Sequence, residues 1–216
     1  MLRLGILYRR ERAHFSKSAR SGAPTPALGA VGLLKDVQGS ALLEFAIVLP
    51  LLVVFVVGIY DFSGAFNQKQ KIEQAAQEGA IIAGAQPMSD IASNSSSTVT
   101  NPDSLQPVLT AIVNSLAGSG VLNQGACQPP FPASAQLGLA WTYTIPGCSS
   151  AYASDNLVIA INRGSVSGSG PAAVCTVVTV TYPYHWRFNS VIQLLFPGAN
   201  YLPVTLTENA TVHNQM

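Results

Sequence analysis

Residues 39–60 read GSALLEFAIVLPLLVVFVVGIY, and this stretch decides the architecture of the chain. Among the twenty residues from Ala41 to Tyr60, Glu44 is the only charged one. A helix of that length rises about 30 Å, which is enough to cross a bilayer. The sequence therefore predicts a transmembrane helix over residues 40–60.

The carboxylate of Glu44 is out of place in such a run. Ionisable residues inside membrane segments cost roughly 2.5–3.5 kcal/mol at the helix centre on insertion scales, and they usually have a function. Glu44 lies near one end of the run, so its cost is smaller and its tip can reach the membrane surface. A functional carboxylate and a tolerated, snorkelling one are the two interpretations, and the pattern around Glu44 favours the first.

Gly39, followed five residues later by Glu44 and then by Phe45 and the apolar run, resembles a class III (type IVb) signal of prepilins. The longer segment at residues 39–80, which ends in QEGA, resembles the TadE-like domain of tight-adherence (Flp) pilus systems. In that family a prepilin peptidase cuts after the glycine. The resemblance thus implies a processing site made of Gly39, Ser40, Glu44 and Phe45, with Ser40 as the first mature residue.

The same resemblance implies a role for Glu44 in the assembled fibre. In the type IV pilin model, a glutamate at this place neutralises the terminal ammonium of a neighbouring subunit and sets the axial register. Two buried charges of opposite sign compensate each other, whereas one alone is costly. The implied protein is a minor pilin or pseudopilin without enzymatic activity. Its implied partners are the prepilin peptidase, other pilins and the proteins of the pilus-assembly platform.

The charges are distributed unevenly along the chain, although the formal net charge is only +1. Residues 1–39 carry seven basic against two acidic residues, hence +5, and the remainder carries four against eight, hence −4. By the positive-inside bias, the amino terminus stays cytoplasmic and everything after Tyr60 is exported. We expect a single-pass protein of the bacterial inner membrane with a periplasmic domain. Incorporation of this protein into a surface pilus is one of the fates that we consider. Residues 1–39 are interpreted as a leader that is removed, the alternative being a cytoplasmic tail that stays attached.

The composition speaks against several other function classes. The basic residues after the leader are few and scattered, so nucleic-acid binding is not expected. Histidines and cysteines do not occur at metal-ligand spacing, and no catalytic constellation or phosphate-binding loop is recognisable. We therefore expect no metal, no cofactor and no small-molecule substrate. The motif His185-Trp186-Arg187 is interpreted as an aromatic surface turn, with a subunit contact as the alternative.

The helical periodicity continues beyond Tyr60 while polar residues enter the pattern. Residues 61–85 are predicted to extend the same helix in amphipathic form, and residues 86–102 to form a polar linker. Pro50 lacks the N–H that would bond the Ala46 carbonyl, so a kink is expected there.

The last segment, residues 103–216, is predicted to be an exported α+β domain. Residues 103–116 have the pattern of a short amphipathic helix with Asp103 at its capping start. Strands are predicted at residues 137–145, 157–162, 174–182 and 203–212, in the order of an antiparallel meander. One core face is expected to hold Trp141, Val158, Val178 and Val180. The predicted fold is thus α+β and type IV pilin-like, with the long amino-terminal helix packed on a small antiparallel sheet.

All three cysteines, Cys127, Cys148 and Cys175, lie on the side that we expect to be exported. One disulfide is the natural expectation in an oxidising compartment. We favour Cys148–Cys175, because Cys175 lies on a predicted strand and Cys148 follows another strand of the same predicted sheet, whereas Cys127 lies in a proline-rich loop.

Two other functions compete with the pilin interpretation. A periplasmic binding protein or enzyme with an ordinary signal peptide would be cleaved at Ser63-Gly64-Ala65, a small-x-small pattern after the apolar run. The apolar run is longer than is usual for such a signal, and Glu44 would then have no purpose. An uncleaved, membrane-anchored pilus assembly factor is the third possibility.

Overall fold

The computed structural model describes residues 37–91, 98–123, 125, 127–148, 152, 154–167, 173–189, 193, 197–198 and 202–214. Two compact units make up the chain, Met1–Ile47 and Val48–Met216. All but the last three residues of the predicted leader lie outside the described ranges. The sheet, the second helix and most of the first helix belong to the second unit.

Helix α1 (Val37–Ala85) is one α-helix that includes Pro50 and ends where the sequence pattern predicts. It is long and apolar enough to cross a membrane, and its most apolar window is not buried in the protein. Most of its exposed large apolar side chains lie in the part of the helix that the sequence assigns to the bilayer, and Phe62, Phe66 and Ile81 lie beyond it. The kink at Pro50 stays a prediction.

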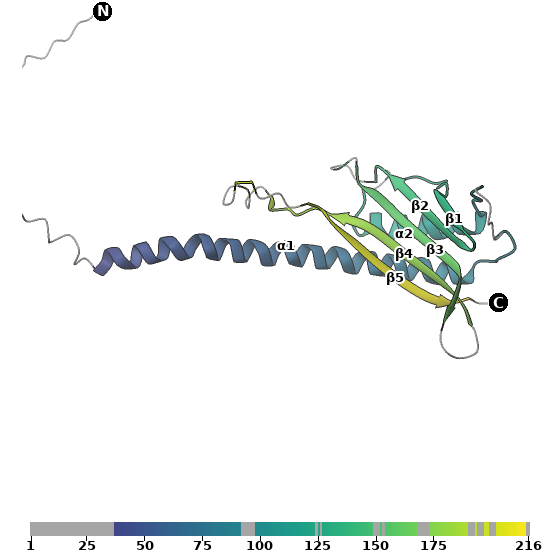
Figure 1. Cartoon of the computed structure of the whole chain (residues 1–216), viewed down its shortest axis with the longest axis horizontal. Helices are drawn as coiled ribbons and strands as arrows, with labels where there is room; N and C mark the ends of the chain where they lie inside the picture. Colours follow the sequence, from purple (N-terminus) through teal and green to yellow (C-terminus); the bar gives the residue numbers. More distant parts are fainter. Residues whose placement is uncertain are drawn as a thin grey trace, which may run out of the picture. The chain divides into compact units, whose positions relative to one another are not determined.

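Five strands form one antiparallel sheet in the order β1-β2-β3-β4-β5 (Figure 1). Their bounds are Ala135–Leu137, Ala140–Pro146, Asn156–Ser167, Ala173–Tyr184 and Val204–His213. The predicted meander is confirmed, together with the α+β class. The sequence predicts one strand over residues 137–145, whereas the structure turns the chain at Gly138, whose φ is 59°. Two-residue hairpin turns need such a positive φ, which glycine adopts without strain.

A 3₁₀ turn η1 (Asp103–Leu105) leads into helix α2 (Gln106–Gly118), close to the predicted helix. The expected cap is wrong, because Asp103 lies inside the turn and makes no side-chain capping bond. The backbone N–H of Ser104 donates instead to the Asp90 carboxylate at 2.7 Å. A residue from the preceding linker therefore satisfies an amide at the start of the helical segment.

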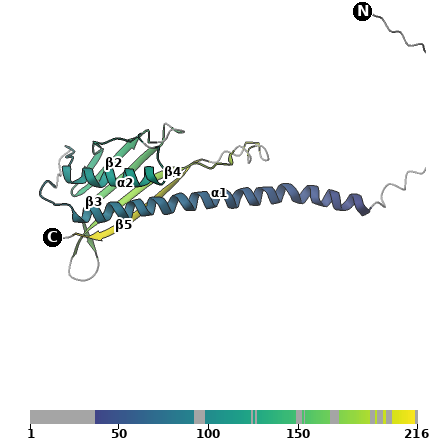
Figure 2. The ribbon, with the colours of Figure 1, turned by 180° about the vertical axis from the view of Figure 1, so that it is seen from behind.

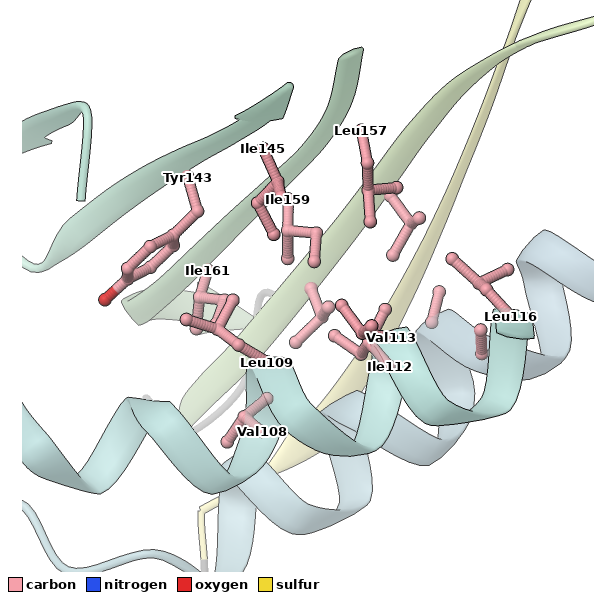
Figure 3. Close-up of a cluster of buried hydrophobic side chains, with 14 of the residues drawn as sticks. Val108, Leu109, Ile112, Val113, Leu116, Tyr143, Ile145, Leu157, Ile159 and Ile161 are labelled. Atoms are coloured by element: carbon pink, nitrogen blue, oxygen red, sulfur yellow. The ribbon is translucent and has the colours of Figure 1, made fainter. Parts of the chain in front are cut away.

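The core lies between the sheet and the two helices. Figure 2 shows α2 and the carboxyl-terminal half of α1 crossing the same face of the sheet. In Figure 3, side chains of α2 point toward the isoleucines and leucine of β2 and β3. This inner face of the sheet contains the buried residues Trp141, Tyr143, Ile145, Leu157, Ile159, Ile161, Val178 and Val180. Burial of their apolar surface is the main stabilising contribution of the domain.

The sequence assigns Val158 to this core face, and that assignment is wrong. Val158 pairs with Thr181 across the ladder, whereas Ile159 pairs with Val180 and Ile161 with Val178. Because successive side chains of a strand alternate between the two faces, Val158 lies on the outer face and its neighbour Ile159 on the inner one. Trp141, Val178 and Val180 do share the core face.

Helix α1 approaches the domain closely because its buried stripe consists mostly of small residues. Ala75, Ala76, Ala80 and Ala83 are fully buried. A Cβ atom at Gly79 would lie 2.5 Å from Ile112 Cδ1, so any larger residue here would force the Ile112 side chain to move. The small stripe, which the sequence analysis expects to pack on the domain, therefore sets how near α1 lies to α2.

Arg163 of β3 fixes the carboxyl-terminal end of α1. Its guanidinium is buried and donates to the carbonyls of Gln86 and Pro87 at 2.7 and 3.1 Å. A cation at this end of a helix also complements the helix dipole. Burial lowers the pKa of Arg163, and the carboxylate of Asp90 opposes that shift.

The expected disulfide Cys148–Cys175 is wrong, because the structure bonds Cys127 to Cys148 with a Cα–Cα distance of 5.3 Å. The register explains the error. Cys148 follows the end of β2 that pairs with Asn156, whereas Cys175 pairs with Ser165 and His213 toward the other end of the sheet. Two cysteines assigned to the same sheet need not be neighbours in it.

The pairing can be checked by peptide mapping without reduction. A peptide linking Cys127 to Cys148 is expected in the wild type and in Cys175→Ser, and it is expected to vanish in Cys127→Ser. On the chain-entropy model, loss of a disulfide that closes a loop of this size lowers the free energy of unfolding by about 3 kcal/mol. A linked peptide that contains Cys175 would contradict the structure.

Candidate processing segment and juxtamembrane clasp

The predicted processing residues lie together in the first turns of α1, within the first unit. The side chains of this segment are exposed, with 62% of Phe45 accessible. The Ser40 hydroxyl donates to Glu44 Oε1 at 3.2 Å, one helical turn away. The carboxylate of Glu44 is therefore held toward Ser40, the residue that the family resemblance makes the mature amino terminus.

Gly39 lies inside the helix, which begins two residues earlier at Val37. A Cβ atom at Gly39 would meet no atom within 4 Å, so nothing in the described protein requires glycine here. A peptidase that cuts after Gly39 would first have to unwind this turn.

The second group of interest surrounds Asp61, the residue directly after the apolar run. Its side chain is 3% exposed although it carries a carboxylate. Asp61 Oδ1 accepts from the backbone N–H of Arg187 at 3.0 Å, and Oδ2 accepts from that of Phe188 at 3.3 Å. The Tyr184 hydroxyl donates to the Asp61 carbonyl at 3.1 Å. We call this set of Asp61, Tyr184, Arg187 and Phe188 the clasp.

Packing around the clasp reinforces it. The rings of Tyr60 and Phe188 meet edge to face, with centroids 5.4 Å apart. A Cβ atom at Gly64 would come within 2.7 Å of the Tyr184 hydroxyl, so this glycine lets β4 approach the helix. Burial and the nearby Asp61 carboxylate raise the pKa of Tyr184, which keeps its hydroxyl a donor.

The turn at His185-Trp186-Arg187 is anchored on its other side as well. His185 Nε2 lies 2.9 Å from both carboxylate oxygens of the buried Asp155. The Tyr152 ring stacks on the imidazole with centroids 3.6 Å apart. Trp186 Nε1 donates to the Leu202 carbonyl at 3.2 Å. His185 thus ties the turn to the β2–β3 connection, and Trp186 ties it to the segment before β5.

His185 and Asp155 line a polar recess of about 310 Å³ together with Lys71 and Arg187. A histidine paired with a carboxylate is a common part of hydrolytic sites. The described residues that line this recess include no serine, threonine or cysteine to act as nucleophile. Within the described ranges, no group of three or more metal-ligating side chains is placed to hold an ion. The pair therefore fits a structural role best.

Asp61 is the residue that sequence reasoning missed. From its sequence context, Asp61 is only one polar residue of an amphipathic helix. An acidic residue at the boundary of an apolar run was the available signal. Its partners are backbone amides 126 and 127 positions later in the chain, and no sequence pattern reports these.

We expect Asp61→Ala to lower the free energy of unfolding by about 1–3 kcal/mol, because two backbone amides lose their acceptor. The full chain in detergent micelles can be unfolded with urea and followed by tryptophan fluorescence. Glu78→Ala, which removes an exposed acid from the same helix, should change stability by less than about 0.5 kcal/mol. Hydrogen exchange should accelerate at the amides of Arg187 and Phe188. Unchanged exchange in Asp61→Ala would mean that the clasp does not hold this turn.

Comparison with known families agrees with the segment that carries these features. Residues 39–80 match the family model described as TadE-like protein. The expected resemblance is thereby confirmed for a segment that includes Glu44, Asp61 and Gly79 and that ends before α2 and the sheet. Neither the comparison with curated proteins nor the comparison with solved structures found a match.

Proposed function

We propose that this chain, which carries a TadE-like segment at residues 39–80, is a minor pilin or pseudopilin of a tight-adherence pilus. The observation that carries the proposal is that the matched segment begins at Gly39 and has Glu44 as its fifth residue after that glycine, at the start of an exposed apolar helix. In this proposal a prepilin peptidase removes residues 1–39. The mature protein is structural and has no enzymatic activity of its own.

The clasp supports the view that the anchor helix is retained in the mature protein. Asp61 and Gly64 lie in α1, and their partners lie in and after β4. Cleavage at Ser63-Gly64-Ala65, as an ordinary signal peptide would require, would remove Asp61 and leave two backbone amides without their acceptor. The small stripe of α1 would also lose its connection to the apolar run. A secreted binding protein or enzyme is therefore disfavoured.

The position of Glu44 supports a role in assembly. Among the described residues, its carboxylate has only the Ser40 hydroxyl as a hydrogen-bond partner, and it lies on an exposed helix surface. In a bilayer or a fibre core, a charged carboxylate with a single hydroxyl partner and no counter-charge is buried at a high cost in free energy. A terminal ammonium from a neighbouring subunit would compensate its charge. An uncleaved assembly factor would supply no such ammonium, and for that candidate Glu44 has no comparable explanation.

Processing is tested by Gly39→Val, which should block cleavage because the side chain no longer fits a tight peptidase pocket. The substitution meets no neighbouring atom, so misfolding is not expected to account for the result. Immunoblots of membranes should detect only the full-length form, whereas Gly118→Val, at another unpacked glycine, should mature normally. Maturation of Gly39→Val at the wild-type rate would refute this cleavage site.

Assembly is tested by Glu44→Ala, which should leave membrane insertion and cleavage largely intact and abolish productive assembly. Insertion should survive because the segment becomes more apolar. Assembly should fail because a buried ammonium loses its counter-charge, at a cost of roughly 3–5 kcal/mol. Membrane level, mature size and surface pilus yield are the three readouts.

Two further variants make the result specific to this carboxylate. Glu44→Asp keeps the charge with a shorter reach and should give an intermediate pilus yield. Glu73→Ala removes an exposed glutamate from the polar half of the same helix and should assemble like the wild type. Normal piliation in Glu44→Ala would reduce Glu44 to a snorkelling carboxylate.

A further inference from the structure

A small recess lies where α1 leaves the apolar run, next to the clasp. Its volume is about 280 Å³, and it is lined by Tyr60, Ser63, Gly64, Asn67 and Arg187. Four of these residues carry a hydrogen-bond donor in the side chain, and none of them is acidic. The recess is thus suited to an anion.

The positive charge of Arg187 makes the electrostatic potential of the recess positive. Within the described ranges, salt bridges join Lys69 to Glu208 and His185 to Asp155, and none involves Arg187. The nearest acid in the clasp, Asp61, is engaged by the backbone amides of Arg187 and Phe188. The guanidinium of Arg187 is exposed and lies beside the Tyr184 hydroxyl, and its planar fork matches phosphate geometry.

The position of the recess along α1 favours a phospholipid headgroup over free phosphate as the ligand. Tyr60 is the last residue of the apolar run, and Ser63 and Asn67 follow three and seven positions later. At 1.5 Å per residue these positions lie roughly 5 and 10 Å beyond the run. The headgroup region of a leaflet is roughly 5–8 Å deep. If α1 spans the bilayer, Tyr60 and Ser63 lie at the level of the phospholipid headgroups, and Asn67 lies just beyond them.

An apolar groove meets the recess at Ser63. The groove is shallow and is formed by α1 alone; it is lined by Val54, Phe55, Gly58, Ile59, Phe62, Ser63 and Phe66. Gly58 has no side chain and a Cβ atom there would meet nothing within 4 Å, so the surface is hollowed between the phenylalanines. A polar recess continued by an apolar groove fits a headgroup with an acyl chain, whereas free phosphate would use only the first.

We infer that this recess and groove form a binding site for one membrane phospholipid, with its phosphate on Arg187 and Ser63 and an acyl chain along the groove. The inference rests on the membrane anchoring of α1 that the proposed function includes. It adds a function to the clasp, because Asp61 sets the position of Arg187 and thereby couples the exported domain to the membrane surface.

The test uses the full chain purified in dodecyl maltoside, a detergent without phosphate. Dioleoyl phosphatidylglycerol is added, and native mass spectrometry counts the lipid molecules that remain bound. The wild type should retain one lipid, and Arg187→Gln should bind it about tenfold more weakly or worse, since a charge-assisted phosphate contact is lost. Lys69→Gln, which removes an exposed cation outside the recess, should bind like the wild type. Arg187→Gln should keep the contacts of Asp61, because Asp61 accepts from the backbone N–H groups of residues 187 and 188.

Two other probes distinguish the lipid from its parts. Inorganic phosphate at the same concentration should bind far more weakly than phosphatidylglycerol, and dioleoylglycerol should be retained equally by the wild type and Arg187→Gln. Binding of inorganic phosphate as tight as that of the lipid would identify a free-anion site and overturn the inference. Equal retention of phosphatidylglycerol by the wild type and Arg187→Gln would also overturn it.

A filled groove provides a second variant that leaves Arg187 in place. Gly58→Leu should weaken binding of phosphatidylglycerol and dioleoylglycerol alike, and unchanged binding of both would contradict the acyl-chain part of the inference. Carbonate extraction of membranes separates this failure from failure of the proposed function. A chain that is released by carbonate is not anchored, which would refute the proposed membrane role. A chain that stays in the membrane and binds no phospholipid refutes only the lipid site.

Discussion

The Asp61 carboxylate joins α1 to the turn that follows β4. The attachment of the helix to the domain next to the apolar run depends on this contact. Two backbone amides of that turn donate to the Asp61 carboxylate, and the hydroxyl of Tyr184, the last residue of β4, donates to the Asp61 carbonyl. Water is largely excluded from this place. A buried carboxylate without these donors would be strongly destabilising. Because Asp61 directly follows the apolar run, the contact fixes the turn at the end of the membrane-type segment.

Helix α1 therefore combines an exposed surface of large apolar side chains with a buried surface of small ones. From Val48 to Tyr60 it exposes large apolar side chains, which favour lipid or the helices of other membrane proteins. From Ile72 to Ala83 it buries small residues against α2 and the sheet, where close approach of the backbones gives dense packing. The match to the TadE-like family covers nearly all of both surfaces, and the sheet lies outside it. The match to the family model thus falls on the helix.

Local sequence patterns predicted the elements well and their partners poorly. The bounds of α1, the position of α2 and the antiparallel order of the strands follow from periodicity and from turn residues. The break at Gly138, the outward direction of Val158 and the pairing of Cys127 with Cys148 depend on turn geometry and register, which are set between strands. Asp61 illustrates the same limit for the candidate site, because its partners are distant backbone amides. Gly39 and Glu44 were found because their signal is contained within a few consecutive residues.

The central claim is that the mature protein keeps α1 from Ser40 onward, so that one helix provides the carboxylate of Glu44, the membrane anchor and the clasp. Amino-terminal sequencing of the wild-type protein isolated from membranes tests this claim most directly. We expect the sequence to begin at Ser40, followed by Ala41-Leu42-Leu43-Glu44. A sequence that begins at Phe66 would contradict the claim, because the anchor and Asp61 would then be absent. A sequence that begins at Met1 would contradict the processing on which the proposed role of Glu44 depends.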